Sequence, residues 1–189
     1  MNFPEIATER LLLTRICTGD SPHIYRLFAD SRVVEYYDLE AFNALAQAEE
    51  LIEFFSSRFE SETGIRWAIR IADSNELIGT CGYNSWSAKM RNAVIGYDLN
   101  PAFWGNGYAS EAVGRIIEAA FSGALACGQI NRIQADTVPG NNASENLLVN
   151  LGFKEEGLRR ESGYWKGRYH DLKCFGLLRA EFQKNITKS

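Results

Sequence analysis

The chain has 189 residues, 46% of them hydrophobic and 23% charged, which suits one folded domain and argues against disorder. A formal net charge of -4 disfavours nucleic-acid binding through a broadly basic surface. No apolar run is long enough to span a bilayer, and residues 1–5 lack the basic and apolar regions of a signal peptide. We therefore expect a cytoplasmic protein with neither a nucleic-acid nor a membrane partner.

The four cysteines lie far apart and form no Cys-x-x-Cys pair, and the two histidines are equally isolated. This spacing does not fit a zinc site, so the sequence predicts no metal cofactor. We interpret the cysteines as buried, reduced thiols.

Apolar periodicity and turn residues divide the chain into alternating strands and helices. The elements expected in the first half are a strand at residues 9–15, helices at 21–29 and 44–58, and strands at 66–71, 77–83 and 92–99. Those expected in the second half are a helix at 108–125, a strand at 132–138, a helix at 143–150, and strands at 153–164 and 169–178. This order predicts an α/β domain with a mixed, mostly antiparallel sheet of about seven strands and helices on both faces.

Two glycines, Gly105 and Gly107, fall in the turn between the strand at 92–99 and the helix at 108–125. Glycine lets the backbone turn sharply and approach a ligand closely. The first N–H groups of a helix have no partner within the helix, and the helix dipole favours negative charge there. A strand, a Gly-x-Gly turn and a helix together are therefore suited to holding phosphate groups.

The two common nucleotide-binding loops do not fit this turn. An ATP-binding loop needs lysine after its last glycine, where this chain has Tyr108. A dinucleotide-binding loop needs a third glycine, where Ser110 stands. A tight turn that binds no ligand would also explain a Gly-x-Gly pair.

The turn resembles the CoA-diphosphate turn of the GNAT superfamily of N-acetyltransferases. That turn commonly has Gln or Arg, two variable residues, Gly, a variable residue, and Gly or Ala. Gly107 and Ala109 match the last two positions, whereas Trp104 stands where Gln or Arg is usual. Binding of the diphosphate is therefore expected to depend on backbone N–H groups.

A second segment, residues 139–153, is similar to the second GNAT motif, because Asn141-x-x-Ser144 precedes an apolar helix and Leu-Gly-Phe. A capped helix ended by glycine is the simpler explanation of this segment alone. Segments typical of the branch that acetylates ribosomal-protein N-termini (RimJ/RimL-like) lie at residues 8–13, 104–112, 157–160 and 169–171. The resemblance covers a GNAT domain at residues 7–180, followed by a tail at 181–189.

The resemblance implies an N-acetyltransferase that moves acetyl from acetyl-CoA to a primary amine by direct attack in a ternary complex. The amine would belong to a protein N-terminus or to a small molecule, and a homodimer is left open. One alternative is a GNAT-fold sensor or scaffold that binds acyl-CoA without turnover. Another is a nicotinamide-dependent oxidoreductase, which the missing third glycine disfavours.

The same resemblance implies where the cofactor lies. Backbone groups at residues 97–99 would bind the pantetheine amides and the reaction oxyanion, residues 105–110 the diphosphate, and Asn141 the pantetheine arm. The residues expected to contact the cofactor are Tyr97, Asp98, Leu99, Trp104, Gly105, Asn106, Gly107, Tyr108, Ala109, Ser110, Asn141 and Ser144.

The general base is not fixed by the sequence. Val94 stands where this branch often has a glutamate. Asp98 and Glu161 are the candidates, although for each a solvated surface carboxylate is the simpler expectation. The aromatic residues from which the acceptor pocket would be drawn are Tyr36, Tyr37, Trp67, Tyr83 and Trp86.

The proton donor is also unusual. Many GNAT enzymes have a tyrosine where this chain has Leu148. Ser144 lies one helical turn earlier on the same face, so we expect its hydroxyl to hydrogen-bond the departing CoA sulfur. Asn142 is expected to cap this helix, because Glu145 follows it at capping-box spacing.

Overall fold

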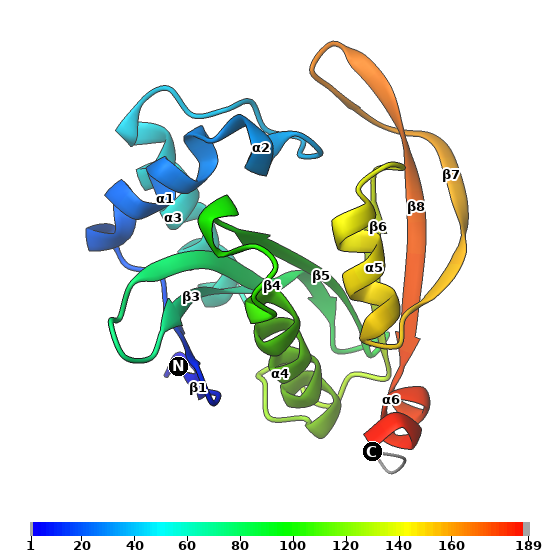
Figure 1. The fold of residues 1–189 in the computed structure, drawn as a ribbon. Helices are drawn as coiled ribbons and strands as arrows, with labels where there is room; N and C mark the ends of the chain where they lie inside the picture. The colour runs from blue at the N-terminus through cyan, green and yellow to red at the C-terminus, as the bar shows by residue number, and fades with distance from the viewer. Residues whose placement is uncertain (1, 187–189) are drawn as a thin grey trace.

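The computed structural model describes the backbone of residues 2–186 and the side chains of residues 2–182. The helices are α1 Ser21–Ala29, α2 Ser31–Val34, α3 Leu45–Glu60, α4 Tyr108–Ser122, α5 Asn142–Asn150 and α6 Arg179–Ile186. The strands are β1 Ile6–Ala7, β2 Leu11–Arg15, β3 Ile65–Ile71, β4 Leu77–Ser87, β5 Asn92–Leu99, β6 Arg132–Thr137, β7 Lys154–Trp165 and β8 Arg168–Leu178. Figure 1 shows their arrangement.

The strands form one sheet in the order β1-β2-β3-β4-β5-β6-β8-β7. Only β5 and β6 are parallel, so the predicted mixed, mostly antiparallel sheet is confirmed. The sheet has eight strands instead of about seven, because the two-residue strand β1 pairs with β2. A strand this short leaves no alternating pattern in the sequence.

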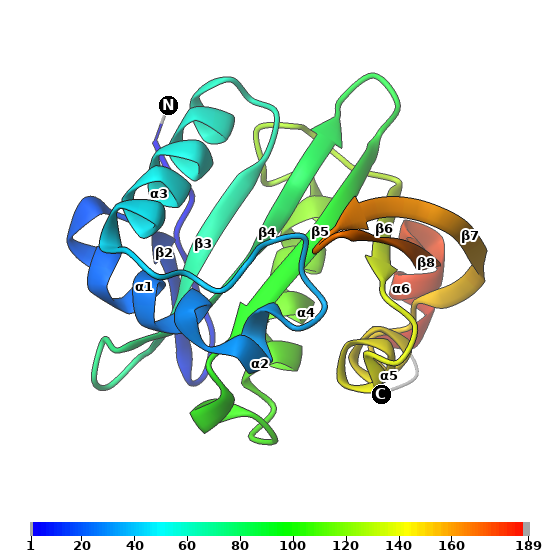
Figure 2. The same ribbon diagram turned by 90° about the horizontal axis from the view of Figure 1, so that it is seen from above.

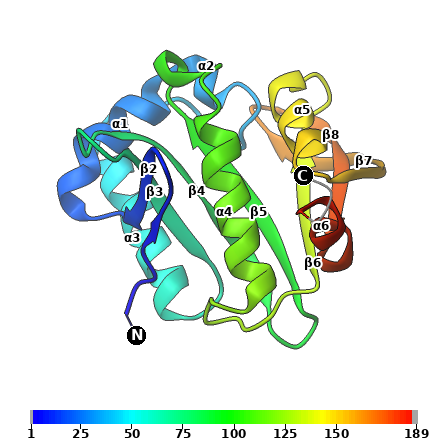
Figure 3. The ribbon, with the colours of Figure 1, turned by 60° about the horizontal axis from the view of Figure 1, so that its bottom comes forward.

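Helices cover both faces of the sheet, as predicted. Helix α4 lies across one face of β2, β4 and β5, and α1 and α3 lie on the other face (Figures 2 and 3). Successive side chains of β3 point to opposite faces of the sheet and so contribute to two hydrophobic cores. Trp67 and Ile69 belong to the core under α4, and Ala68 belongs to the core under α1 and α3. Helix α5 packs on β6 and β7.

The sheet opens between its two parallel strands. Asn92, Ala93 and Val94 of β5 pair with β6, and beyond them β5 pairs only with β4. In Figure 1 the end of β5 diverges from the half of the molecule that contains α5, β6 and β8. Residues 95–99 therefore expose backbone groups that have no partner from β6.

The tail expected at residues 181–189 begins within a helix. Helix α6 begins within the expected domain and continues into the expected tail, where Phe182 packs against Phe121 and Glu181 pairs with Lys154. Residues 187–189 of that tail lie outside the described residues. Helix α2 was also not predicted, because a four-residue helix shows no periodicity.

Two of the four cysteines, Cys81 and Cys127, are buried as expected, but Cys17 is exposed and Cys174 is half-buried. Across residues 2–186 no helix is long and apolar enough to cross a bilayer. Within the same part of the chain, no three His, Cys, Asp or Glu side chains gather to hold a metal ion.

Candidate active site

A cleft of about 830 Å³ lies where β5 and β6 part. Its walls are the end of β5, the turn before α4, the first turn of α5 and part of residues 32–38. The cleft lining includes Tyr97, Asp98, Leu99, Trp104, Gly105, Gly107, Tyr108, Ala109, Ser110, Asn141 and Ser144. Asn106 and Glu161 are not among the lining residues.

The glycine turn presents backbone to this cleft. Gly105 and Gly107 have φ angles of 77° and 79°, in the left-handed region that favours glycine. A Cβ atom at Gly107 would meet only the Nη2 atom of Arg10, at 3.4 Å, so backbone conformation and not crowding requires the glycine. Tyr108, Ala109 and Ser110 then begin α4 with unpaired N–H groups at the cleft.

Arg10 holds this turn from outside. Its Nη1 donates to the Asn106 carbonyl (2.9 Å), its Nε donates to the Glu111 carboxylate (2.7 Å), and its guanidinium lies 4.6 Å from the centre of the Tyr108 ring. Thr8 Oγ1 also donates to Glu111, at 2.6 Å. Although burial opposes ionisation, hydrogen bonds from Thr8 and Arg10 lower the pKa of Glu111.

The contacts of Thr8 and Arg10 with Glu111, hereafter the Arg10 clasp, were not predicted. Glu111 lies in the first turn of α4, where the helix dipole favours a negative charge, but this position does not point to a partner near the start of the chain. Residues 8–13 were noted as a family signature, but nothing in the sequence places them beside residues 106–111.

Trp104, at the position where Gln or Arg is usual, has a structural contact. Its indole Nε1 donates to the Leu99 carbonyl at 2.8 Å, which ties the turn to the end of β5. The Asn106 side-chain amide donates to the carbonyls of Phe103 (3.2 Å) and Trp104 (3.1 Å). Polar side chains thus stabilise the turn itself, and its backbone N–H groups remain available to a ligand.

Asn141, not Asn142, caps α5, so that expectation was wrong. Asn141 has a non-helical ψ of 65°, and its Oδ1 accepts from the Ser144 N–H at 3.3 Å. Glu145 does not complete a capping box, because its carboxylate binds Lys173 on β8 at 2.7 Å.

The Ser144 hydroxyl lies 2.6 Å from the Tyr97 hydroxyl, which joins α5 to β5 inside the cleft. Burial, together with the charge of Asp98, raises the pKa of Tyr97 to about 12, although the Ser144 hydrogen bond opposes this. Only the backbone of Tyr97 was expected to act, so its hydroxyl was missed. No motif pairs a strand residue with a helix residue so distant in sequence.

Asp98 is buried, so its expected place on the solvated surface was wrong. Its Oδ2 accepts from Thr80 Oγ1 at 2.7 Å and lies 3.4 Å from Arg66 Nη2. Its Oδ1 is buried and has no hydrogen-bond partner within the described part of the chain. The ion pair with Arg66 and the hydroxyl of Thr80 compensate for the burial of this carboxylate.

Two glycines make room for that ion pair. Arg66 on β3 lies opposite Gly82 on β4, which lies opposite Gly96 on β5. A Cβ atom at Gly96 would come within 3.1 Å of Arg66 Nη1 and within 2.8 Å of the Asn84 amide. The guanidinium therefore lies across the sheet over two strand positions that carry no side chain, next to the Asn84 amide.

Glu161 lies apart from these groups. It is exposed, with a φ of 49°, where the pairing of β7 with β8 is interrupted between Arg159 and Gly163. Its backbone N–H donates to Asp171 at 2.8 Å. The structure therefore does not bring Glu161 to Tyr97 and Ser144.

Of the five aromatic residues considered for the acceptor pocket, Tyr36 and Tyr37 line the cleft. The Tyr36 hydroxyl donates to the Gly140 carbonyl at 3.2 Å. Trp67 is fully buried, and Trp86 lines no described cavity. A smaller cavity of about 500 Å³, which Tyr83 also lines, adjoins the cleft at residues 37, 38 and 84.

The glycine turn, the open edge of β5 and the paired hydroxyls of Tyr97 and Ser144 all border one cleft. Residues 10–154 match the acetyltransferase (GNAT) domain family. The uncharacterized N-acetyltransferase YoaA of Bacillus subtilis is 36% identical over 177 residues, which cover 94% of this chain and 98% of the relative. The chain belongs to the GNAT acetyltransferase family, and it is an N-acetyltransferase.

Solved structures have the same fold. The ribosomal L7/L12 α-N-protein acetyltransferase RimL superposes with a TM-score of 0.81 at 20% identity, covering 93% of this chain and 94% of that one. Spermidine N-acetyltransferase from Vibrio cholerae, in complex with CoA and spermine, gives a TM-score of 0.77 at 22% identity, covering 93% and 99%. At these identities the likeness shows the fold alone.

Proposed function

We propose that the protein transfers the acetyl group of acetyl-CoA to the primary amine of a small molecule or a protein N-terminus, by direct attack in a ternary complex. The observation that carries this proposal is the open edge of β5 at residues 95–99, which ends at the glycine turn. Backbone N–H groups of the turn suit a diphosphate, and those of β5 suit amides and an oxyanion.

The residues that would hold the cofactor follow from this geometry. The N–H groups of residues 105–110 bind the diphosphate, whose negative charge the α4 dipole favours. Asn141 uses its Oδ1 to cap α5, so its Nδ2 remains to bind the pantetheine arm. When bound, acetyl-CoA supplies the activated thioester.

Ser144 and Tyr97 act on the leaving sulfur. If the Tyr97 hydroxyl donates to Ser144 Oγ, the Ser144 hydrogen is free to point at the thiolate. A phenol with a pKa of about 12 is a much weaker acid than a thiol, whose pKa is ordinarily about 8.5. The hydroxyl pair therefore stabilises the thiolate by hydrogen bonds and keeps its own protons.

Asp98 is the proposed base. Its buried Oδ1, which has no hydrogen-bond partner among the described residues, accepts the amine proton through a water molecule, and its Oδ2 lies 3.4 Å from Arg66 Nη2. Glu161 lies outside the cleft lining and is not needed in this scheme.

The test is thiol release from acetyl-CoA in the presence of peptides, polyamines, amino acids and aminoglycosides. Continuous release with at least one amine, and formation of its N-acetyl product, supports the proposal. Tight binding of acetyl-CoA without amine-dependent release across the panel would favour the alternative of a non-catalytic acyl-CoA sensor.

A further inference from the structure

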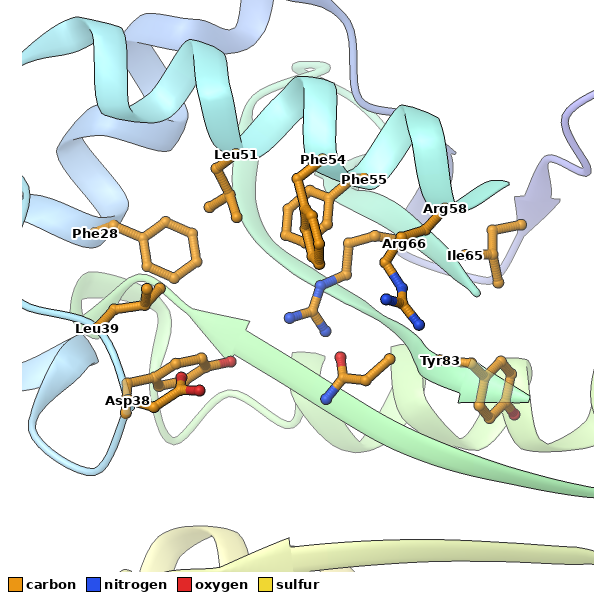
Figure 4. Close-up of a pocket in the computed structure, with 12 residues that line it drawn as sticks. Phe28, Asp38, Leu39, Leu51, Phe54, Phe55, Arg58, Ile65, Arg66 and Tyr83 are labelled. Carbon is orange, nitrogen blue, oxygen red and sulfur yellow. The ribbon is translucent and has the colours of Figure 1, made fainter. Parts of the chain in front are cut away.

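The smaller cavity beside the cleft has a chemical character of its own. It lies between α3 and strands β3 and β4, and it meets the cleft at Tyr37, Asp38 and Asn84 (Figure 4). Leu39, Leu51, Phe54 and Phe55 supply much of its apolar lining. We call it the arginine pocket, because Arg58 and Arg66 also line it.

The guanidinium of Arg66 is buried in this pocket with hydrogen bonds unmade. Its side chain is 7% exposed, and among the described residues neither Nε nor Nη1 has a hydrogen-bond partner. Asp98 Oδ2 lies 3.4 Å from its Nη2, and the Tyr37 side chain interacts with both Arg66 and Asp98. The Phe55 ring centre lies 5.1 Å from the guanidinium carbon. A buried hydrogen-bond donor without a partner costs free energy, so a ligand that accepts hydrogen bonds from these donors should bind more tightly.

Arg58 adds a third such donor. Its Nε is buried without a partner in the described part of the chain, while its Nη2 donates to the Thr63 carbonyl at 3.3 Å. Figure 4 shows the guanidinium groups of Arg58 and Arg66 together inside the cavity, beside the phenyl rings of Phe54 and Phe55. Planar guanidinium groups form paired hydrogen bonds with the two oxygens of a carboxylate, whereas they repel a cation.

We propose that the acceptor is an α-amino acid with an apolar or aromatic side chain, whose carboxylate binds Arg66 and Arg58. This inference rests on the proposed function of the adjoining cleft. Asp98 lies 3.4 Å from Arg66, so an amine beside Asp98 and a carboxylate beside Arg66 need be only a few bonds apart. Asp38, at the junction of the two cavities, also faces the amine end. The apolar side chain packs against Phe54 and Leu51, and a polyamine would meet two guanidinium groups.

The first experiment measures binding alone, by calorimetric titration of phenylalanine, phenylalaninamide and spermidine. We expect phenylalanine to bind about tenfold or more tightly than phenylalaninamide, because the amide cannot satisfy the guanidinium donors as an anion does. Spermidine should bind most weakly. Equal affinity for acid and amide, or preference for spermidine, would overturn the inference.

Variants of Arg58 and Arg66 test whether the preference for phenylalanine over its amide arises in the arginine pocket. Arg58→Met should reduce the ratio of acid to amide affinity by several-fold, whereas Arg115→Met, which removes an exposed arginine from α4, should leave that ratio unchanged. Arg66→Lys keeps a charge beside Asp98 but loses the planar donors, so it should also reduce the ratio. An unchanged ratio in both pocket variants would refute the assignment.

The same ligands tested for thiol release separate the two proposals. Selective binding of phenylalanine, with no thiol release from any amine of the panel, would contradict the proposed transfer but leave the pocket assignment standing. Turnover of peptides or polyamines in preference to phenylalanine would support the transfer and refute the pocket assignment.

Discussion

Tyr97 and Asp98 are neighbours in sequence, but their side chains point to opposite faces of β5. Tyr97 packs with the core under α4 and bonds Ser144, whereas Asp98 meets Arg66 and Thr80. In the proposed reaction, this alternation places the group that stabilises the thiolate on one face and the base on the other. Two consecutive residues of one strand would then act on the attacking amine and on the departing thiolate.

Ser144→Ala should lower turnover about tenfold or more and leave acetyl-CoA affinity nearly unchanged. The variant should melt close to the wild type, because Asn141 supplies the cap of α5. Turnover and melting temperature should be measured on the same sample. Normal turnover with a clearly lowered melting temperature would mean that the Ser144 hydroxyl serves only the fold.

Tyr97→Phe tests the hydroxyl pair from the strand side. If Tyr97 acts through Ser144, the double variant Tyr97→Phe/Ser144→Ala should lose about as much turnover as Ser144→Ala alone. Independent, multiplicative losses in this double-mutant cycle would contradict the proposed coupling.

Asp98→Asn should lower kcat by about tenfold or more, because the amine loses its proton acceptor. It should also lower the melting temperature, because Arg66 would keep a buried charge without its partner. Glu161→Gln is the matched control and should retain wild-type kcat, since Glu161 is exposed outside the cleft. Loss of activity in the control but not in Asp98→Asn would reverse the assignment.

Among the elements, the turn before α4 depends on a segment almost a hundred residues away. The Arg10 clasp connects the approach to β2 with the first turn of α4, and Trp104 connects the same turn with the end of β5. A loop held at both ends loses less conformational freedom when a ligand binds, which favours affinity.

Gly107→Val should weaken acetyl-CoA binding by about tenfold or more. Valine does not readily adopt a φ of 79°, so the turn would rearrange and its N–H groups would no longer converge. Gly114→Ala is the matched control, because its added carbon makes only an ordinary 3.7 Å contact with Leu151. If calorimetry gives Gly107→Val and wild type the same affinity for acetyl-CoA, the turn does not bind the cofactor.

Glu111 gives the clasp a pH dependence. Because the pKa of Glu111 is lowered in the folded protein, its ionised form stabilises the fold at neutral pH. This stabilisation is lost as the pH falls through the folded-state pKa. Glu111→Gln should therefore have a lower melting temperature than wild type near pH 7. The difference between the two melting temperatures should become smaller toward about pH 4 or below. Glu118→Gln, which changes an exposed pair on the same helix, should show no such narrowing.

At the scale of the whole molecule, the sheet connects its two halves through only three paired residues of β5 and β6, within the described part of the chain. A cofactor bound along β5 and against α5 would contact both halves. Acetyl-CoA at about 100 times its Kd should stabilise the fold by about 2.7 kcal/mol, seen as a raised melting temperature. Amide exchange should slow at residues 95–99, and NAD should produce neither effect. If NAD raised the melting temperature and slowed amide exchange as much as acetyl-CoA does, the cleft would not be a site selective for CoA.

Most of the architecture could be predicted from the sequence, because long periodic segments and glycine turns specify their own conformation. The misses are the short elements β1 and α2 and the helix α6 at the end of the chain. The glycine turn and Ser144 could be proposed from their local patterns. Arg66 and the hydroxyl of Tyr97 could not, because their partners depend on strand register and on the packing of α5.

The indole of Trp104 has a further consequence for experiments. Trp104 is 49% exposed at the edge of the cleft, while Trp67 is fully buried. Because its Nε1 is bonded to the Leu99 carbonyl, any ligand that settles on the turn changes the polarity around a fixed fluorophore. Binding of a ligand at the turn should therefore change the intrinsic tryptophan fluorescence of the native protein. A Trp104→Phe variant would show which part of that fluorescence change comes from Trp104.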